Sequence, residues 1–339
     1  MEDQRIIGGE YRIESGALRC EIRNKCNADF SIGRTCLYSI IDALKSIVGE
    51  VLLPDYMCSS IVEVLIRIDI PIKHYHINTS FNPEIDDIKR VAKDCNERFA
   101  ILLISYFGMV NLDDTISAIR VEFPEAILII DDVQNYYGFG KHKDYDYCFT
   151  SYRKWFATPD GADVIIKENM PSVHSYPLQA DYVMYKVAGN ILKNYREMIG
   201  DLVSLELIEK GEKMMDEEYR FGCSELSKRL FCRIDTESIA KKRKQNAKYL
   251  HNGLKRLGIL HLYNPTQVPL FVPIVVKERD VLRKKLFADN IFTPVHWLLE
   301  DTNKQGDNEL YRTELSLICD QRYDLDDMER VLRGIENAM

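Results

Sequence analysis

The sequence contains no CxxC pair, although nine cysteines are scattered over its 339 residues. An odd number of cysteines without such a pair argues against a disulfide framework and against a cysteine zinc site. The chain also lacks an apolar segment at its N-terminus and an apolar run long enough to span a membrane. We therefore expect reduced, mostly buried thiols and a cytoplasmic protein with no membrane partner.

Positive charge is not in excess either, because the formal net charge is −8. A nucleic-acid partner is therefore not expected. The one dense basic run, residues 241–244, falls within a predicted amphipathic helix and is expected to form a solvated helix face. His74 and His76 share one face of a predicted strand, but no third ligand accompanies them in the sequence, so no metal site is predicted.

The composition is that of an ordinary globular protein, with 46% hydrophobic and 29% charged residues. The length allows a substantial core and favours two domains. We expect an N-terminal arm over 1–30 with a short strand at 17–22, a large domain over 31–235 and a small C-terminal domain over 236–339.

Predicted strands and helices alternate along the large domain. The apolar patterns place strands at 51–53, 73–77, 100–106, 127–130, 147–150 and 161–166, and helices at 36–47, 59–68, 83–92 and 113–123. Ser59 or Ser60 is expected to cap the second of these helices. Residues 178–220 are expected to be helical. This alternation predicts an α/β fold with a mainly parallel sheet between helices on both faces.

The last hundred residues have a different pattern. Helices are expected at 237–257, 280–289 and 325–335, and strands at 269–276, 292–296 and 314–318. This order predicts a compact α+β domain.

Charged side chains follow two of the predicted buried strands. Asp131 ends the strand at 127–130, and Lys154 lies 154 − 131 = 23 residues later, just after the next strand. In open α/β sheets the ligand crevice lies at the carboxyl ends of the strands. A lysine there can form a Schiff base, and an aspartate can hold a protonated ring nitrogen, which together suit a pyridoxal-phosphate (PLP) enzyme. The alternative is a loop lysine and a helix-capping aspartate.

Other residues could complete such a site. Gly33, Arg34 and Thr35 open a predicted helix, and free N–H groups at a helix N-terminus bind phosphate. Ser151, three residues before Lys154, is a second phosphate candidate. Gln134 could reach the ring hydroxyl. Asp132 should point to the other side of its strand and is interpreted as structural, whereas His296, at the end of a predicted strand, is a candidate for substrate contact.

In this order the motifs resemble the DegT/StrS family of fold-type I PLP-dependent aminotransferases, most of which act on sugars. The matching segments run over nearly the whole chain, from about residue 30 to 335, and are Gly33-Arg34-Thr35, Asp131-x-x-Gln134, Ser151-x-x-Lys154, Pro159-Asp160-Gly161-Ala162, Thr293-Pro294-Val295-His296-Trp297 and Asp320-Gln321-Arg322-Tyr323.

The resemblance implies a role for each matching residue. Lys154 would be the Schiff-base lysine and Asp131 the partner of the pyridine nitrogen, so these two are the catalytic candidates. The cofactor-binding candidates are Gly33, Arg34, Thr35, Cys58, Asp131, Gln134, Ser151 and Lys154. The substrate-contacting candidates are Tyr106, Tyr219, Arg220, His296 and Arg322. The resemblance also implies a mostly parallel sheet of the seven-stranded type, a small C-terminal domain and a homodimer with shared active sites.

The sequence departs from the family pattern at three places. Ser105-Tyr106-Phe107-Gly108 stands where His-x-Tyr-Gly is common, and Cys58 stands where many members stack an aromatic ring on the cofactor. Glu218-Tyr219-Arg220 stands for the Asn-Tyr-Arg element that a neighbouring subunit supplies. These differences bear on the substrate more than on the cofactor.

The resemblance predicts an aminotransferase that moves an amino group from glutamate to a keto-sugar nucleotide in surface-polysaccharide or glycan synthesis. Two alternatives stay open. One is another PLP reaction such as sugar dehydration, although family dehydratases replace the lysine with histidine and Lys154 is present. The other is a non-catalytic regulator or partner protein on the same fold.

Overall fold

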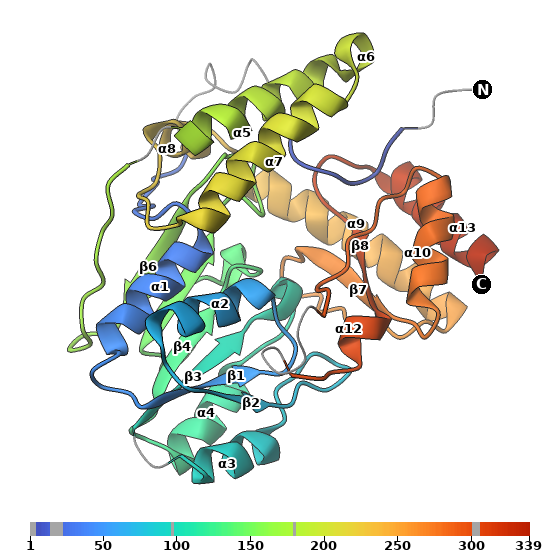
Figure 1. Cartoon of the computed structure of the whole chain (residues 1–339). Coiled ribbons are helices and arrows are strands. Elements are labelled where there is room, and N and C mark those ends of the chain that lie inside the picture. Colours follow the sequence, from blue (N-terminus) through green and yellow to red (C-terminus); the bar gives the residue numbers. More distant parts are fainter. Residues whose placement is uncertain (1–4, 14–22, 96–97, 179–180, 300–305) are drawn as a thin grey trace. The chain divides into compact units, whose positions relative to one another are not determined.

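The computed structural model describes residues 5–13, 23–95, 98–178, 181–299 and 306–339 (Figure 1). The strand expected at 17–22 lies outside the described residues. The chain forms two compact units: the first contains Met1–Gly9, Lys45–Asp146 and Thr236–Met339, and the second contains Glu10–Leu44 and Tyr147–Asp235. The chain passes from the second unit to the first between Asp235 and Thr236, where a domain boundary was expected. However, residues 45–146 and 236–339, which were expected in different domains, belong to the same unit. The domain assignment stays a prediction.

The first unit contains four parallel strands in the order β2-β1-β3-β4. Their bounds are β1 (Glu50–Pro54), β2 (Ile72–Tyr75), β3 (Phe99–Ile104) and β4 (Ile127–Asp131). Helices α2 (Ser59–Ile68), α3 (Ile85–Lys93) and α4 (Asp113–Glu122) connect them, with short 3-10 turns η2 (Tyr106–Gly108) and η3 (Tyr136–Gly138). Each of these strands and helices was predicted within a few residues.

Both faces of β1 and β4 are buried, and β3 is buried from its second residue on. A strand buried on both faces reads as a continuous apolar run, which is why the sequence of β3 and β4 shows no alternation. The register pairs Ile104 with Asp131, and the carbonyl of Asp131 accepts from the N–H of Ser105 at 3.1 Å. The polar residues after β3 and β4 therefore emerge at the same edge.

The rest of the first unit pairs β7 (Phe271–Val275) with β8 (Glu314–Ile318) in antiparallel register. Helices α9 (Thr236–Leu257), α10 (Arg279–Ala288), α12 (Leu310–Thr313) and α13 (Leu325–Ala338) accompany this pair. A capping box formed by Asp324 and Asp327 fixes the start of α13. These elements match the α+β pattern expected of the C-terminal residues.

The strand expected at 292–296 is wrong. Among the described residues the segment makes isolated backbone bonds, from the N–H of Phe292 to the carbonyl of Ile7 and from the N–H of Ser316 to the carbonyl of Pro294, and no strand ladder. Proline has no N–H to donate to a ladder, so Pro294 interrupts pairing on this segment.

The second unit contains the antiparallel pair β5 (Tyr147–Ser151) and β6 (Ala162–Ile166), on which α1 (Gly33–Leu44) packs. Figure 1 shows the long helices α5 (Asp181–Leu192) and α7 (Leu202–Glu217) running side by side as a hairpin. The remaining elements are η4 (Lys193–Tyr195), α6 (Arg196–Ile199) and α8 (Glu225–Phe231). The described strands of the expected large domain number six, four parallel and two antiparallel, where a seven-stranded type was expected.

None of the described helices is long and apolar enough to cross a membrane.

Candidate active site

The end of β4 carries two consecutive carboxylates with different surroundings. Asp131 is 6% exposed, and its Oδ1 accepts from the N–H of Val133 at 2.8 Å. Gln134 is 2% exposed, and its Oε1 accepts from the N–H of Phe107 at 2.9 Å. The Nε2 of Gln134 is buried and has no hydrogen-bond partner among the described residues. A buried donor without a partner is costly, so this amide suits an acceptor on a bound group.

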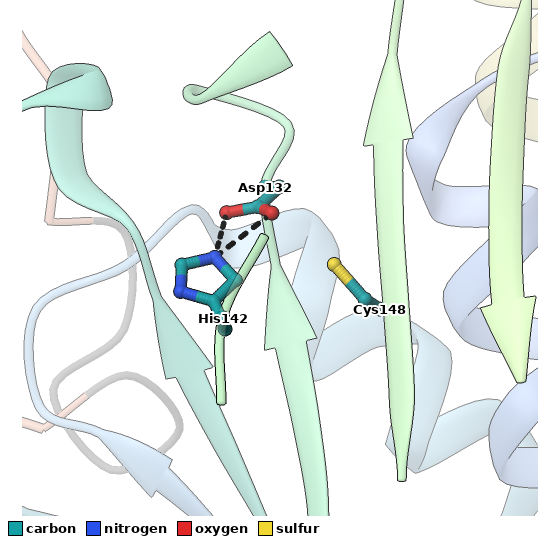
Figure 2. A group of neighbouring side chains, drawn as sticks. All are labelled: Asp132, His142 and Cys148. Atoms are coloured by element: carbon teal, nitrogen blue, oxygen red, sulfur yellow. Dashed lines mark hydrogen bonds and ion pairs between the residues drawn. The ribbon is translucent and has the colours of Figure 1, made fainter. Parts of the chain in front are cut away.

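Asp132 is fully buried and held by side chains on three segments. Its carboxylate accepts from the hydroxyl of Ser105 at 2.6 Å and from Nδ2 of Asn135 at 3.1 Å. Figure 2 shows the ring of His142 against the same carboxylate, with Nε2 2.9 Å from both oxygens. Burial alone lowers the pKa of His142, but the hydrogen bond and charge of Asp132 raise it above its usual value. The structural role expected of Asp132 agrees with these contacts.

His142 lies in the loop after η3, yet its side chain is only 8% exposed. The sequence signal for this pairing is weak, because the neighbours of His142 in the loop, Lys141 and Lys143, are charged and do not distinguish it from a solvated side chain. Only the need of a fully buried carboxylate for donors points to a partner.

Lys154 lies in the turn that follows β5, in the second unit. The turn is closed by the N–H of Trp155 and of Phe156, which both donate to the carbonyl of Tyr152. Ser151, the last residue of β5, is 2% exposed, and its hydroxyl lies 3.5 Å from the carbonyl of Gly161. The lysine and the serine are therefore both placed at the carboxyl end of β5, as predicted.

The residue before Lys154 is anchored by charge. Arg153 pairs with Glu212 on α7 at 2.6 Å, and the ammonium group of Lys186 on α5 pairs with the same carboxylate. Lys186 is 2% exposed, and burial and the charge of Arg153 lower its pKa. Burial by itself raises the pKa of Glu212, but the two cations lower it to about 2. The pairing fixes the Lys154 turn to the α5–α7 hairpin.

Gly33, Arg34 and Thr35 form the first turn of α1, as predicted. One guanidinium nitrogen of Arg34, Nη2, pairs with Asp216 at 2.8 Å, and the group lies over the ring of Tyr219. Its Nε is buried and has no hydrogen-bond partner among the described residues. Thr35 is fully buried and donates its hydroxyl to the carbonyl of Tyr219. The turn can still receive an anion through Nε of Arg34 and backbone N–H groups.

Tyr219 and Arg220 differ in exposure. Tyr219 is 1% exposed and meets the ring of Tyr38 edge-on at 5.7 Å, so it packs within its own unit. The Arg220 side chain is 49% exposed and pairs with Glu218 at 2.6 Å. Of the two residues, only Arg220 has a side chain accessible to another molecule, and its reach to a second subunit stays a prediction.

Cys58 is the N-cap of α2, so the expected serine cap is wrong. Its backbone is extended at φ −71° and ψ 135°, and its sulfur accepts a hydrogen bond from the hydroxyl of Ser60 at 3.0 Å. The aromatic residues of this region instead form a cluster after β1 and β3. Tyr56 contacts Tyr106 at 5.7 Å and Trp297 at 5.3 Å between ring centroids.

Tyr106, a candidate for substrate contact, is fully buried in this cluster. Its hydroxyl donates to the carbonyl of Tyr56 at 2.5 Å, and burial raises its pKa well above the usual value. The structure thus gives Tyr106 a packing role, and its substrate role stays a prediction.

His296 is half-buried and lies between the rings of Phe107 and Phe271. Its Nδ1 is 2.8 Å from the hydroxyl of Ser316, and its backbone N–H donates to Glu314 at 2.7 Å. The guanidinium of Arg322 donates two hydrogen bonds to the carboxylate of Asp320, from Nε to Oδ1 at 2.9 Å and from Nη2 to Oδ2 at 2.7 Å. It also donates to the carbonyl of Gly9. Arg322 therefore holds a local turn and the N-terminal segment.

The sequence reading missed Glu314, which begins β8 and is fully buried. Burial raises the pKa of Glu314 to about 8, against the opposing effects of Ser316, the N–H of His296 and Arg279. A glutamate opening a mostly apolar strand was the available signal, but a strand-end glutamate usually faces solvent.

The residues that would meet PLP fit that group. Asp131 supplies a buried carboxylate for a ring nitrogen, and Gln134 supplies a buried amide donor that lacks a partner among the described residues. Ser151, Lys154 and the first turn of α1 supply the hydroxyl, amine and anion-binding groups. Taken unit by unit, the groups of the first unit suit the ring nitrogen and hydroxyl of the cofactor, and those of the second unit suit its aldehyde and phosphate.

No protein-family model and no curated protein matches the chain. Solved structures do. Spr1654 from Streptococcus pneumoniae, assigned as a sugar aminotransferase and solved in its PMP form, is 11% identical with a TM-score of 0.69, and the match covers 98% of each chain. A DegT DnrJ EryC1 StrS aminotransferase from Brucella abortus is 14% identical with a TM-score of 0.62 over 93% of this chain and 86% of its own.

DesI, solved in the presence of its TDP-sugar product, is 14% identical with a TM-score of 0.63, over 96% of this chain and 85% of its own. The fold is that of the DegT/StrS aminotransferases. The α/β fold class predicted from the sequence is thereby confirmed. At identities of 11 to 14% the shared property is the fold.

Replacing Glu212 by glutamine should destabilise this DegT/StrS-type fold by about 2–4 kcal/mol, because Arg153 and Lys186 lose their shared anion. The pKa of Glu212 is lowered from 4.5 to about 2, so its contribution is present above pH 4.5 and is lost as the pH falls toward 2. Urea unfolding of Glu212→Gln and wild type should therefore converge in acid. Glu209→Gln, an exposed change on the same helix, is the control, and equal losses in both variants would contradict the assignment.

Glu314 should make stability depend on pH with the opposite sign. Its pKa is raised from 4.5 to about 8, so the folded chain binds this proton more tightly than the unfolded chain. The contribution is present below pH 4.5 and is lost as the pH rises through 8, by up to about 1.4 kcal/mol per pH unit. The free energy of unfolding of wild type relative to Glu314→Gln should fall between about pH 5 and 8. A difference that stays constant over this range would refute burial of an ionisable carboxyl, and the exposed change Glu309→Gln is the control.

Proposed function

We propose that the protein is a PLP-dependent aminotransferase that transfers an amino group from glutamate to a keto-sugar nucleotide. The observation that carries the proposal is the position of Asp131 and Lys154, each at the carboxyl end of a buried strand, in a chain with the fold of the DegT/StrS aminotransferases. The TDP-sugar product present in the DesI structure supports a nucleotide sugar as acceptor. We further propose a role in surface-polysaccharide or glycan synthesis in the cytoplasm.

Each candidate residue would have its own role in the proposed reaction. Lys154 Nζ would bond the aldehyde carbon of the cofactor and, when displaced by an incoming amine, would carry a proton between the substrate carbon and the cofactor. Asp131 would keep the ring nitrogen protonated, and Gln134 would donate to the ring hydroxyl. Ser151 and the first turn of α1 would hold the phosphate. PLP, when bound, supplies the electron sink for the carbanion formed on proton removal.

Substrate contacts are proposed for side chains that the structure leaves partly exposed. His296 and Arg220 have accessible surface, whereas Tyr106 and Tyr219 are buried and would act by shaping the pocket. Arg322 would contribute through the turn it holds with Asp320. A two-fold dimer in which Arg220 approaches the partner's site completes the proposal.

One observation favours a non-catalytic protein on the same fold as the second candidate. The groups expected to hold phosphate already have internal partners, because Arg34 pairs with Asp216 and Thr35 donates to the carbonyl of Tyr219. A protein that has lost the cofactor would be colourless after purification. A yellow protein whose colour changes on addition of glutamate would support the aminotransferase.

Two substitutions test the chemistry directly. Asp131→Asn keeps an oxygen for the N–H of Val133, so the fold should persist while most of the rate is lost. Lys154→Ala should lose about 10²-fold or more, because the proton carrier is gone. Both variants should retain bound PLP through the phosphate contacts. The assay is transfer from glutamate to a panel of keto-sugar nucleotides.

The exposed changes Asp114→Asn and Lys143→Ala are the matched controls for this assay. A wild-type rate in Lys154→Ala would refute the proposal.

Substitution of Arg34 distinguishes the aminotransferase from the non-catalytic protein. If Arg34 binds the phosphate, Arg34→Ala should lose PLP on dialysis faster than wild type, with a loss on the order of 1.5–3 kcal/mol for a charge-assisted hydrogen bond. Asp216→Asn removes the internal partner and should retain PLP at least as well as wild type. Equal PLP loss from wild type and Arg34→Ala would show that this arginine serves only its pair with Asp216.

A further inference from the structure

Three side chains in the first unit form a continuous hydrogen-bonded chain, and the proposed roles use only one of them, His296. The hydroxyl of Ser316 is 2.5 Å from Oε1 of Glu314 and 2.8 Å from Nδ1 of His296. The other carboxylate oxygen of Glu314, Oε2, accepts from the backbone N–H of His296 at 2.7 Å. Glu314 and Ser316 are fully buried and His296 is half-buried, so the chain leads from a half-buried residue to the interior.

The serine hydroxyl has one proton and two neighbours that can accept it. When Glu314 is ionised, the hydroxyl donates to Oε1 and its oxygen accepts from Nδ1–H of His296. When Glu314 is protonated, Oε2 is already engaged by a backbone N–H, so the carboxyl proton lies on Oε1 and donates to Ser316. The serine then donates to Nδ1, and the neutral imidazole carries its proton on Nε2. The two states differ by one proton.

We propose that His296, Ser316 and Glu314 form a proton relay in which a proton taken up at Nε2 of His296 is stored on the buried carboxyl of Glu314. Three transfers balance the step. A proton binds Nε2, the Nδ1 proton passes to the oxygen of Ser316, and the serine proton passes to Oε1 of Glu314. The ring stays neutral in both end states, and release runs the same transfers in reverse.

The surroundings place the switch in a useful pH range. Burial raises the pKa of Glu314 to about 8, while the positive charge of Arg279 on α10 opposes the rise. Arg279 is itself 5% exposed and donates to the backbone carbonyls of Glu314 and Tyr311. Among the described residues the phenol of Tyr56 also lies against Glu314, and burial raises the pKa of Tyr56 well above the usual value, so it stays neutral.

The relay has a task if His296 contacts the acceptor, and in this respect it rests on the proposed function. Forming an amine from a ketone expels the carbonyl oxygen as water. The nitrogen of the donated amino group bonds to the carbonyl carbon, and one of its protons converts the carbonyl oxygen to a hydroxyl. The carbon–oxygen bond then breaks as the nitrogen lone pair forms the carbon–nitrogen double bond, and the departing hydroxyl needs one further proton to leave as water. His296 in its Nε2–H form donates that proton, and Glu314 replaces it through Ser316. Glu314 and Ser316 act through His296 and are positioning residues.

The direct test is the tautomer of His296 in the full-length protein, read by nitrogen NMR of ¹⁵N-histidine-labelled samples. His296→Asn identifies the signal by its absence. In wild type the proton should lie on Nε2 at pH 7 and on Nδ1 at pH 9.5. Glu314→Gln places an amide N–H where the carboxyl proton would lie, so its His296 should keep the Nε2–H form at both pH values. An unchanged tautomer in wild type across this range would overturn the relay.

Ser316→Ala is the second variant, because it removes the bridging hydroxyl and keeps the buried carboxyl. Its His296 should lose the tautomer change near pH 8, whereas exposed Glu309→Gln should keep it. A tautomer change that persists in Ser316→Ala would overturn the relay, as would a change in Glu314→Gln that follows wild type. If Glu314→Gln does not fold, the pH dependence of the His296 tautomer in wild type decides the question by itself.

Activity distinguishes this inference from the function on which it rests. If the protein is an aminotransferase with this relay, the limb of the kcat–pH profile near pH 8 should be present in wild type and lost in Glu314→Gln. A normal tautomer change without any amino transfer would overturn the proposed function and leave the relay standing. Amino transfer with identical pH profiles in wild type, Glu314→Gln and Ser316→Ala would overturn the relay alone.

Discussion

A carboxylate removed from water needs hydrogen-bond donors, and the candidate site depends on how this chain supplies them. β4 carries Asp131 and Asp132 out of a fully buried strand one after the other. Asp132 receives donors from Ser105, Asn135 and His142, each worth about 1.5–3 kcal/mol when the acceptor is charged. Because these three residues satisfy the carboxylate of Asp132, the neighbouring Asp131 can lie in different surroundings.

The same physical demand is met differently elsewhere in the chain. Glu212 in the second unit is held ionised by two cations, whereas Glu314 in the first unit is buried with a serine, a backbone N–H and a nearby arginine. Two paired cations outweigh burial and lower a pKa, but neutral donors do not. The pKa of Glu212 therefore lies below neutral pH, and the pKa of Glu314 lies above it. Glu212 anchors the structure, and Glu314 is the proposed proton store.

Strand runs and their ends were predictable from the sequence, because apolar β-branched residues followed by a polar residue leave few alternatives. β4 and the Lys154 turn were placed this way. Contacts between distant segments were not predictable: His142 reaches Asp132 from the loop after η3, and Glu314 at the start of β8 contacts His296 in a segment that forms no strand. The strand expected at 292–296 failed for a local reason, since Pro294 cannot donate to a ladder. Pairing partners of polar residues depend on the fold, which single-sequence patterns do not encode.

The proposed function depends above all on a covalent bond between Lys154 and the cofactor. The direct measurement is reduction of the purified protein with borohydride after incubation with PLP, followed by digestion and peptide mapping. The account predicts one modified peptide, containing Lys154, and loss of the label in Lys154→Ala. A label on another lysine, such as the buried Lys186, or no reducible label at all, would contradict it.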